Sequence, residues 1–530
     1  MPRRRFGVLW RALLAMVIVV GAAAGATATA GLLEVAHVVQ IINVHKALTT
    51  KGITAPQPGA PETMLVIGVD HRFGQGSSPG NTDTMILVRL NDSSTTINML
   101  SIPRDLAVDI PGAGTEKINA AYSIGGPSLL LKTIRDNVIP NLKVNHILLV
   151  DFASFSNLIN ALGCVYSDID QRYYNMSQGA ANPVTDYSSI NIQPGYQKLC
   201  GGTGSDFGGP NTALAFVRFR HNDSDIVREA RQQDFLRWAK ESLPSGQTLL
   251  ARRTELLKDF ANDVQSDGTL HTTDGLIELF DLAFNSDGST IKSIPFPYGP
   301  GVVINGGDDL SFSEAAAERA YREFMAPTRP SSTSAAQKPS SSGAGKPHSR
   351  ASRKPRFRLP AYMAADPAGG RAQAAALGPV GIPVYYPQDV PTNFTYCSSA
   401  STNCDIGYEP ASAYAGSYPR KYLIDGPGSK RYRAYVMTLV LTYGGVTDLG
   451  TGEYFTVQGT TWQDPPILQD PTKVVVVNGK RLAEYYQGGA LRLVAWHTPS
   501  AVYWVSNTIQ SNVSAAQMVA MAATFARARG

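Results

Sequence analysis

The chain has 530 residues, of which 43% are hydrophobic and 17% are charged; this composition excludes a disordered protein and is sufficient for two or three folded domains. The formal net charge is +5, but twelve positive charges lie in two short segments, at arginines 3, 4, 5 and 11 and within residues 327–358. Subtracting them leaves −7 for the rest, so the folded part is mildly acidic and a nucleic-acid-binding body is not expected.

Residues 12–33 form an apolar run without a charged residue, "ALLAMVIVVGAAAGATATAGLL". About 20 such residues are needed to cross a bilayer, and the arginines before them place residues 1–11 in the cytoplasm and the bulk outside it. A cleaved signal peptide is the alternative, because "ATATA" offers small residues for cleavage. The length of the run favours an uncleaved single-pass anchor in the cell membrane.

Residues 34–61 are predicted to be a stalk that ends in the proline-rich "APQPGAP". Within residues 62–325, short apolar runs typical of strands alternate with helical patterns. The predicted strands are "MLVIGV", "MILVRL", "TINMLSI", "HILLV" and "ALAFVRFR", and the predicted helices are "PSLLLKTIRDNV", "DFASFSNLINALG" and "DIVREARQQDFLRWAKESL". This alternation predicts an α/β sandwich built on a mixed sheet.

Residues 327–358 are rich in Ser, Pro, Lys and Arg and are predicted to be a flexible basic linker. It acts either as a solvated spacer or as a contact to anionic lipid or wall polymer. Residues 359–530 are predicted to be an accessory α+β domain, an antiparallel sheet with a hairpin at Asn478-Gly479 and a C-terminal helix. Its sequence contains no catalytic constellation, which favours binding or contact with an envelope protein partner.

The four cysteines fall into two local pairs, Cys164 with Cys200 and Cys397 with Cys404. Neither pair has a CxxC spacing, and the histidines do not complete a zinc pattern. In an exported protein two disulfides are the simplest interpretation, with free buried thiols as the alternative.

Two acids lie at the ends of predicted neighbouring strands: Asp70 follows "MLVIGV", and Asp83 precedes "MILVRL". An acid at a strand end often caps a turn. Two such acids can instead converge on one magnesium ion, which commonly binds one or two carboxylates together with substrate phosphates.

Basic residues concentrate further along the chain. Arg104 and Asp105 leave a strand after Pro103, where a surface salt bridge is the simple interpretation. Arg218 and Arg220 are two apart on a predicted strand and therefore on one face.

The following predicted helix carries Arg228, Arg231 and Gln232 at helical spacing, where a solvated face is the alternative. However, four arginines lie within fourteen residues, and arginine forks match phosphate oxygens two at a time. Because no glycine-rich phosphate loop is present, side chains must bind the anion.

The segments "GVDHR", "NTDT", "SIPRD", "VDFASFSNLINALG", "ALAFVRFRH" and "DIVREARQQDF" occur in an order and spacing that resembles the LytR–CpsA–Psr family. The resemblance covers residues 62–325. It implies an extracytoplasmic α/β/α sandwich with a mixed central sheet, a hydrophobic tunnel for a polyprenyl tail, an arginine-lined pyrophosphate site and a magnesium ion.

By position, the resemblance implies magnesium ligands at Asp70 and Asp83. The implied catalytic and pyrophosphate-side set is Arg104, Asp105, Arg218, Arg220, Arg228 and Gln232. Further implied substrate contacts are Arg72, Asn81, Arg231 and Gln233. Asn81 stands where many members have Arg, so one phosphate contact is lost or is supplied from elsewhere. Cys164 replaces a second glycine and would tie that helix end to Cys200.

The implied function is transfer of a glycopolymer from a polyprenyl-pyrophosphate carrier to peptidoglycan by phosphoryl transfer, with Asp83 or Asp105 as candidates to accept the hydroxyl proton. A hydrolase that uses water as the nucleophile is one alternative. A non-catalytic envelope-binding or regulatory protein is the other. The glycopolymer and its acceptor are not specified by the sequence.

Overall fold

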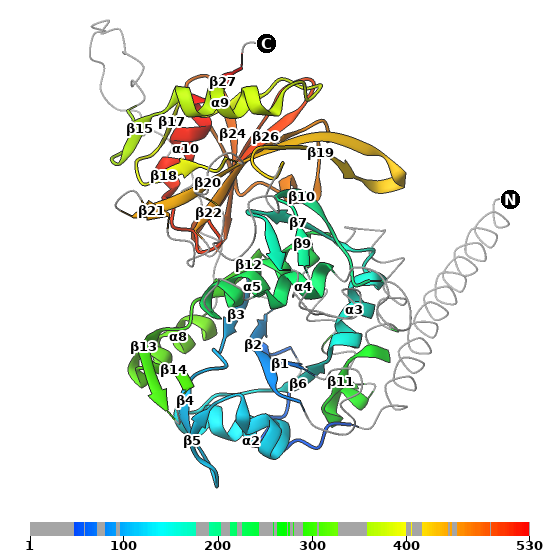
Figure 1. Ribbon diagram of the computed structural model, residues 1–530. Coiled ribbons are helices and arrows are strands. Elements are labelled where there is room, and N and C mark those ends of the chain that lie inside the picture. The colour runs from blue at the N-terminus through cyan, green and yellow to red at the C-terminus, as the bar shows by residue number, and fades with distance from the viewer. Residues whose placement is uncertain are drawn as a thin grey trace, which may run out of the picture.

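A computed structural model of the chain describes most of the two predicted domains (Figure 1). The described residues are 47–57, 59–70, 80–91, 96–175, 190–202, 212–219, 225–242, 262–272, 290–304, 307–326, 358–398, 416–443, 453–487 and 489–528, with a few isolated positions between them. The predicted anchor at 12–33, Arg72, Arg220 and all but the last residue of the predicted linker lie outside this set. Within it, no helix is both long enough and apolar enough to span a membrane.

The N-terminal domain is built on a six-stranded sheet with the order β11-β6-β1-β2-β3-β12. Its strands are β1 (Glu62–Val69), β2 (Thr82–Leu90), β3 (Thr96–Ser101), β6 (His146–Val150), β11 (Gln265–Ser266) and β12 (Thr290–Ile294). Strand β1 runs parallel to β6, and β3 parallel to β12, whereas β1–β2, β2–β3 and β6–β11 are antiparallel. The predicted mixed sheet is confirmed.

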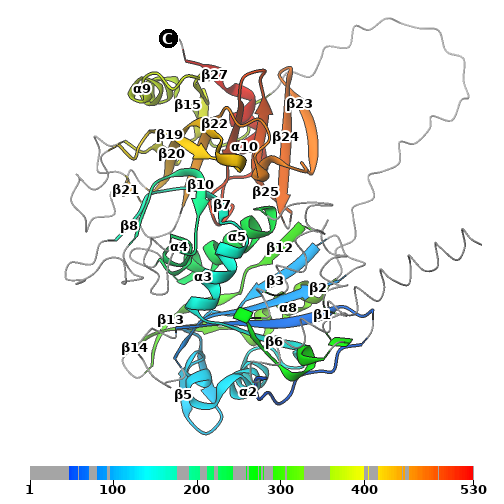
Figure 2. The same cartoon turned by 90° about the vertical axis from the view of Figure 1, so that its right-hand side faces the viewer.

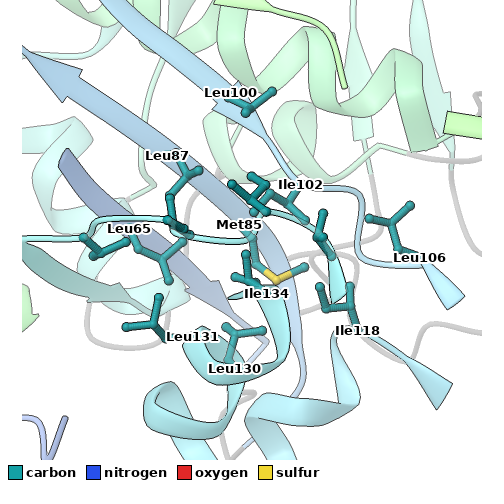
Figure 3. Close-up of a cluster of buried hydrophobic side chains, with 14 of the residues drawn as sticks. Leu65, Met85, Leu87, Leu100, Ile102, Leu106, Ile118, Leu130, Leu131 and Ile134 are labelled. Atoms are coloured by element: carbon teal, nitrogen blue, oxygen red, sulfur yellow. The ribbon is translucent and has the colours of Figure 1, made fainter. Parts of the chain in front are cut away.

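Helix α2 (Ala120–Asn137) covers one face of this sheet (Figure 3). Alternate strand residues such as Leu65 and Leu87 are fully buried against Leu130 and Ile134 of α2. Each such side chain stabilises the fold by about 1.5–3 kcal/mol when it leaves water. Helix α8 (Glu314–Met325) packs on β3, where the Asn98 side chain donates to the Phe324 carbonyl at 2.8 Å.

The other side of the sheet carries a second group of elements (Figure 2). They are α3 (Phe152–Ala161), β7 (Val165–Ile169), β8 (Tyr173–Asn175), β9 (Ile190–Ile192), β10 (Gly195–Leu199), α4 (Thr212–Arg218) and α5 (Asp225–Ser242). Two peripheral hairpins complete the domain, β4 (Ala107–Ile110) with β5 (Gly114–Lys117) and β13 (Tyr298–Ile304) with β14 (Gly307–Phe312).

The prediction of a strand at "ALAFVRFR" is wrong, because residues 212–218 form helix α4. All five residues from Ala213 to Val217 are buried. A short run that is apolar on every side has no period to distinguish a strand from a buried helix.

The C-terminal domain contains a nine-stranded sheet in which all pairings are antiparallel. Its strands are β18 (Phe394–Tyr396), β19 (Arg420–Asp425), β20 (Arg431–Tyr443), β21 (Val446–Thr447), β22 (Tyr454–Thr460), β23 (Lys473–Val477), β24 (Lys480–Gln487), β25 (Ala490–His497) and β26 (Val502–Ser506). Around it lie α9 (Pro367–Leu377), α10 (Ala515–Thr524) and the short strands β15 (Met363–Ala365), β16 (Tyr385–Tyr386), β17 (Asp389–Pro391) and β27 (Ala526–Arg527). The predicted α+β class is confirmed.

Two local predictions are also confirmed. Asn478 and Gly479 join β23 to β24 with φ angles of 50° and 76°, as a two-residue hairpin turn requires. Both disulfides, Cys164–Cys200 and Cys397–Cys404, are formed. The first links the end of α3 to the end of β10.

His146 of β6 is fully buried between two acids. Its Nε2 lies 3.1 Å from Glu62 Oε2, and its Nδ1 lies 3.5 Å from Asp267 Oδ2. Burial alone would lower the pKa of His146, but hydrogen bonds and charge from Asp267 and Glu62 outweigh it and raise this pKa to about 9. His146 is therefore a charged bridge between β1, β6 and the segment after β11.

This bridge predicts a pH-dependent stability. The folded protein holds the His146 proton more tightly than the unfolded chain, whose histidine has a pKa of 6.5. The stabilisation, about 3 kcal/mol, is fully present below pH 6.5 and is lost as the pH rises through 9. Thermal melting from about pH 6 to about pH 10 should show this loss, and His146→Gln should abolish it. The exposed His497 offers a control, since His497→Gln should leave the profile unchanged. An unaltered profile in His146→Gln would contradict the assignment.

Candidate active site

The two predicted metal-binding acids lie at the same end of the central sheet. Asp70 follows β1 directly, Asp83 is the second residue of β2, and Val69 pairs with Thr82 between them. The Asp70 amide donates to the Asn81 carbonyl at 2.8 Å, which holds the strand ends together. Both carboxylates remain accessible, with about a fifth of each side chain exposed (18% and 20%).

Arg218 brings the end of α4 to this edge. Its Nη2 lies 3.7 Å from Asp70 Oδ2, and its guanidinium lies over the Phe152 ring at 4.3 Å from the ring centre. The side chain is 21% exposed, so its fork is held by an acid and an aromatic face while part of it remains available to an anion.

Arg104 approaches from the turn after β3. Its Nη1 donates to Asp83 Oδ1, and its Nε lies 3.4 Å from Asp105 Oδ2. The surface salt bridge proposed for Arg104 and Asp105 is therefore part of a larger network that includes Asp83. Arg104 is 16% exposed, and Asp105 is 8% exposed.

Lys117 is a member of this network that the sequence did not reveal. Its Nζ lies 2.8 Å from Asp105 Oδ1 and 3.9 Å from Asp309 Oδ1. The register of the β4–β5 hairpin, in which Lys117 pairs with Ala107, places it there. No local motif signals that pairing, so only the folded hairpin identifies it.

The polar residues of α5 point inward. Arg228, Arg231, Gln232 and Gln233 are all less than a tenth exposed, so the alternative of a solvated helix face is wrong. Arg231 is fully buried; it donates to the Phe219 carbonyl at 2.7 Å and lies over the Tyr173 ring. This placement favours a positioning role for Arg231.

The two glutamines connect α5 to its neighbours. Gln232 donates to the Val217 carbonyl at 3.2 Å, next to Arg218, and Gln233 donates to the Ser101 hydroxyl at 2.7 Å, at the end of β3. Helix α5 thus fixes both the end of α4 and the strand that precedes Arg104.

The residues at this edge fit the donor set of magnesium. In the described ranges, no three acids, histidines or cysteines lie close enough to hold a metal ion by themselves. Asp70 and Asp83 nonetheless offer two accessible carboxylates, and magnesium commonly completes such a pair with water and substrate phosphates. The magnesium site stays a prediction that depends on bound pyrophosphate.

The sequence model of the LytR_cpsA_psr family matches residues 35–323, which is more than half of the chain. The chain belongs to this family. The match includes both acids and every arginine and glutamine proposed from the sequence.

Two relatives carry names that describe an activity. The polyisoprenyl-teichoic acid–peptidoglycan teichoic acid transferase TagU of Oceanobacillus iheyensis is 32% identical over 216 residues, 38% of this chain and 58% of TagU. TagT of Bacillus subtilis, named as the same transferase, is 28% identical over 229 residues, 42% of this chain and 66% of TagT. Less than two thirds of either relative is therefore matched.

Among solved structures, YwtF (TagT) of Bacillus subtilis with bound octaprenyl pyrophosphate lipid is 21% identical to this chain. The superposition covers 53% of this chain and 98% of that one, with a TM-score of 0.37.

Proposed function

We propose that this protein is a phosphotransferase of the cell envelope that moves a glycopolymer from a polyprenyl-pyrophosphate carrier onto peptidoglycan, outside the cytoplasmic membrane. The observation that carries the proposal is the convergence of Asp70, Asp83, Arg104 and Arg218 at one sheet edge. Two accessible acids beside two accessible arginines suit a pyrophosphate with its counter-ion. The names of TagU and TagT support the same substrate class.

The chain offers a surface for each part of such a substrate. Val66, Val88 and Val150 are half-buried on the sheet face opposite α2 and provide an apolar surface for the lipid tail. Arg104 and Arg218 bind and orient the phosphates beside that face. Bound magnesium, held by Asp70 and Asp83, would supply additional positive charge to the phosphoryl group and the leaving group.

In the proposed reaction, an acceptor hydroxyl attacks the sugar-side phosphorus. The phosphorus–oxygen bond to polyprenyl phosphate breaks, and polyprenyl phosphate leaves while the two arginines stabilise the developing negative charge. Asp83 and Asp105, which both contact Arg104, are the two candidates to accept the hydroxyl proton.

Turnover of a defined polyprenyl-pyrophosphate oligosaccharide, with and without peptidoglycan fragments, tests the proposal. We expect the sugar phosphate to appear on the fragments and polyprenyl phosphate to be released only when the fragments are present. Equal release without fragments would identify a hydrolase. Binding without release under either condition would identify a non-catalytic envelope protein.

Replacing Asp70 or Asp83 should change the response to magnesium. Asp70→Ala removes one proposed ligand but leaves Arg218, so the lipid pyrophosphate should still bind while half-maximal turnover requires about tenfold more magnesium. Titration of turnover with magnesium, together with lipid binding, measures the two effects separately. Asp109→Ala, at an exposed acid on β4, is the matched control. An unchanged magnesium response in both variants would remove these acids from the metal site.

A further inference from the structure

The two domains are joined by a buried aromatic interface. Tyr166 of β7 lies edge-on to Trp462 at 5.1 Å between ring centres, and Tyr196 of β10 lies edge-on to Trp504 at 6.0 Å. All four rings are less than a tenth exposed and belong to one apolar cluster. Figure 2 shows β7 and β10 beneath the C-terminal sheet.

A buried acid lies within this interface. Asp168 of β7 accepts hydrogen bonds from Gln458 of β22 and Ser506 of β26. Burial raises the pKa of Asp168, against the hydrogen bonds from Ser506 and Gln458, which lower it. A cavity of about 30 Å³ adjoins Asp168 and is lined by both domains. It has room for about one or two waters, so this junction is not a second substrate site.

The same interface holds the C-terminal half of α5. Glu241 Oε1 lies 3.4 Å from Arg237 Nε on its own helix and 3.4 Å from Arg492 Nη2 on β25. Arg237 also donates to Gln487 of β24, and Gln487 in turn donates to Ser293 of β12 at 3.2 Å. Two strands of the C-terminal sheet thus fix the helix whose Gln232 contacts the end of α4 beside Arg218.

A second set of contacts links the C-terminal domain to Arg231 of α5 through the segment after β7. Thr438 of β20 donates to the Asp170 carbonyl at 3.1 Å, and the Arg172 amide donates to the Tyr418 hydroxyl at 2.7 Å. Asp170 accepts from the Tyr173 hydroxyl at 2.7 Å, and the Arg231 guanidinium lies 4.8 Å from the centre of the Tyr173 ring.

We propose that the C-terminal domain is a positioning element of the active site: through Arg492 and Gln487 it fixes α5, and so holds Arg228 and Gln232 in place. Arg228 and Arg237 are nine residues apart, which corresponds to about 14 Å along a rigid helix. The effect of these contacts on catalysis rests on the proposed function, but their effect on the position of α5 does not.

Arg492→Ala and Gln487→Ala test this positioning of α5 in the full chain. Backbone amide exchange in residues 225–242 should become about tenfold faster in both variants, with no change in β1 and β2. With the lipid-pyrophosphate glycan, kcat should fall about tenfold with a smaller change in KM, because misplaced groups weaken transition-state stabilisation. Arg492→Lys should restore part of both properties, and serves as the test variant if Arg492→Ala does not fold.

Arg431→Ala is the matched control. Arg431 also forms an ion pair in the C-terminal domain, with Asp425, but both side chains are mostly exposed. Unchanged exchange in α5, or faster exchange with unchanged kcat, would overturn the proposal. If the wild-type protein lacks turnover, the proposed function fails. Faster amide exchange confined to α5 in the Arg492 and Gln487 variants would still show that the C-terminal domain positions this helix.

Discussion

Alanine at Arg104 or Arg218 should reduce glycopolymer transfer by about ten- to a hundredfold at each site, because a charge-assisted contact contributes about 1.5–3 kcal/mol. Each arginine already forms an ion pair with an accessible acid, Arg104 with Asp83 and Arg218 with Asp70. Removing either one takes an arginine away from both the acid and the incoming pyrophosphate. Turnover of a defined lipid-pyrophosphate glycan measures the loss.

Lysine should restore little activity at these positions, since it retains the charge but lacks the two-pronged geometry of arginine. Arg322→Ala is the control, because this arginine of α8 forms an exposed ion pair with Glu318 in the same domain. Near-normal turnover in the Arg104 and Arg218 variants, with normal melting, would mean that these residues form only a surface salt network.

Arg231 should respond differently from these two arginines. It is fully buried among Tyr173, Phe216 and Phe219, so alanine at this position should lower the melting temperature. Thermal melting is therefore measured first, and the kinetics of this variant are compared only where it is folded. Sequence spacing alone places Arg228 and Arg231 on one helix face and cannot reveal that this face points inward.

The sequence predicted the mixed sheet and the C-terminal α+β domain because their signals are local. Short apolar runs mark β1 and β2, and the Asn478-Gly479 pair marks a hairpin because both residues readily adopt the positive φ angles that its turn requires. The failure at α4 has a physical cause, since Ala213–Val217 is buried on every side and carries no period. The local pairing of Asp70 and Asp83 could be anticipated from β1 and β2 being neighbours. Lys117 could not, because it reaches Asp105 only through the β4–β5 register.

The relation between the domains was beyond sequence reasoning for a similar reason. A basic linker and the absence of clustered acids or arginines predicted an accessory domain that binds a partner. The contacts that join this domain to the N-terminal domain link residues some 250–340 positions apart, such as Arg237 with Gln487 and Asp168 with Ser506. No local pattern encodes such pairs, and each of these side chains would be read as an ordinary surface group.

Truncation after Met325 should therefore destabilise the N-terminal domain. It would expose Tyr166 and Tyr196, which are buried against Trp462 and Trp504, and would remove both hydrogen-bond donors of Asp168. Burying an aromatic side chain contributes about 1.5–3 kcal/mol, so the loss of two such contacts should lower the melting temperature by about 10 °C or cause aggregation. Differential scanning fluorimetry and size-exclusion chromatography measure both outcomes.

Cleavage of the linker is the matched experiment, because it keeps every interface contact and removes only the covalent connection. A protease site inserted between Ala336 and Lys346 allows the intact protein to be cut after folding. The two pieces should elute together, melt near the temperature of the uncut protein and retain turnover, since the aromatic cluster and the Asp168 hydrogen bonds hold them. Separation of the pieces on cutting, or a truncated domain that melts and turns over normally, would show that the interface contributes little and that the linker alone keeps the domains together.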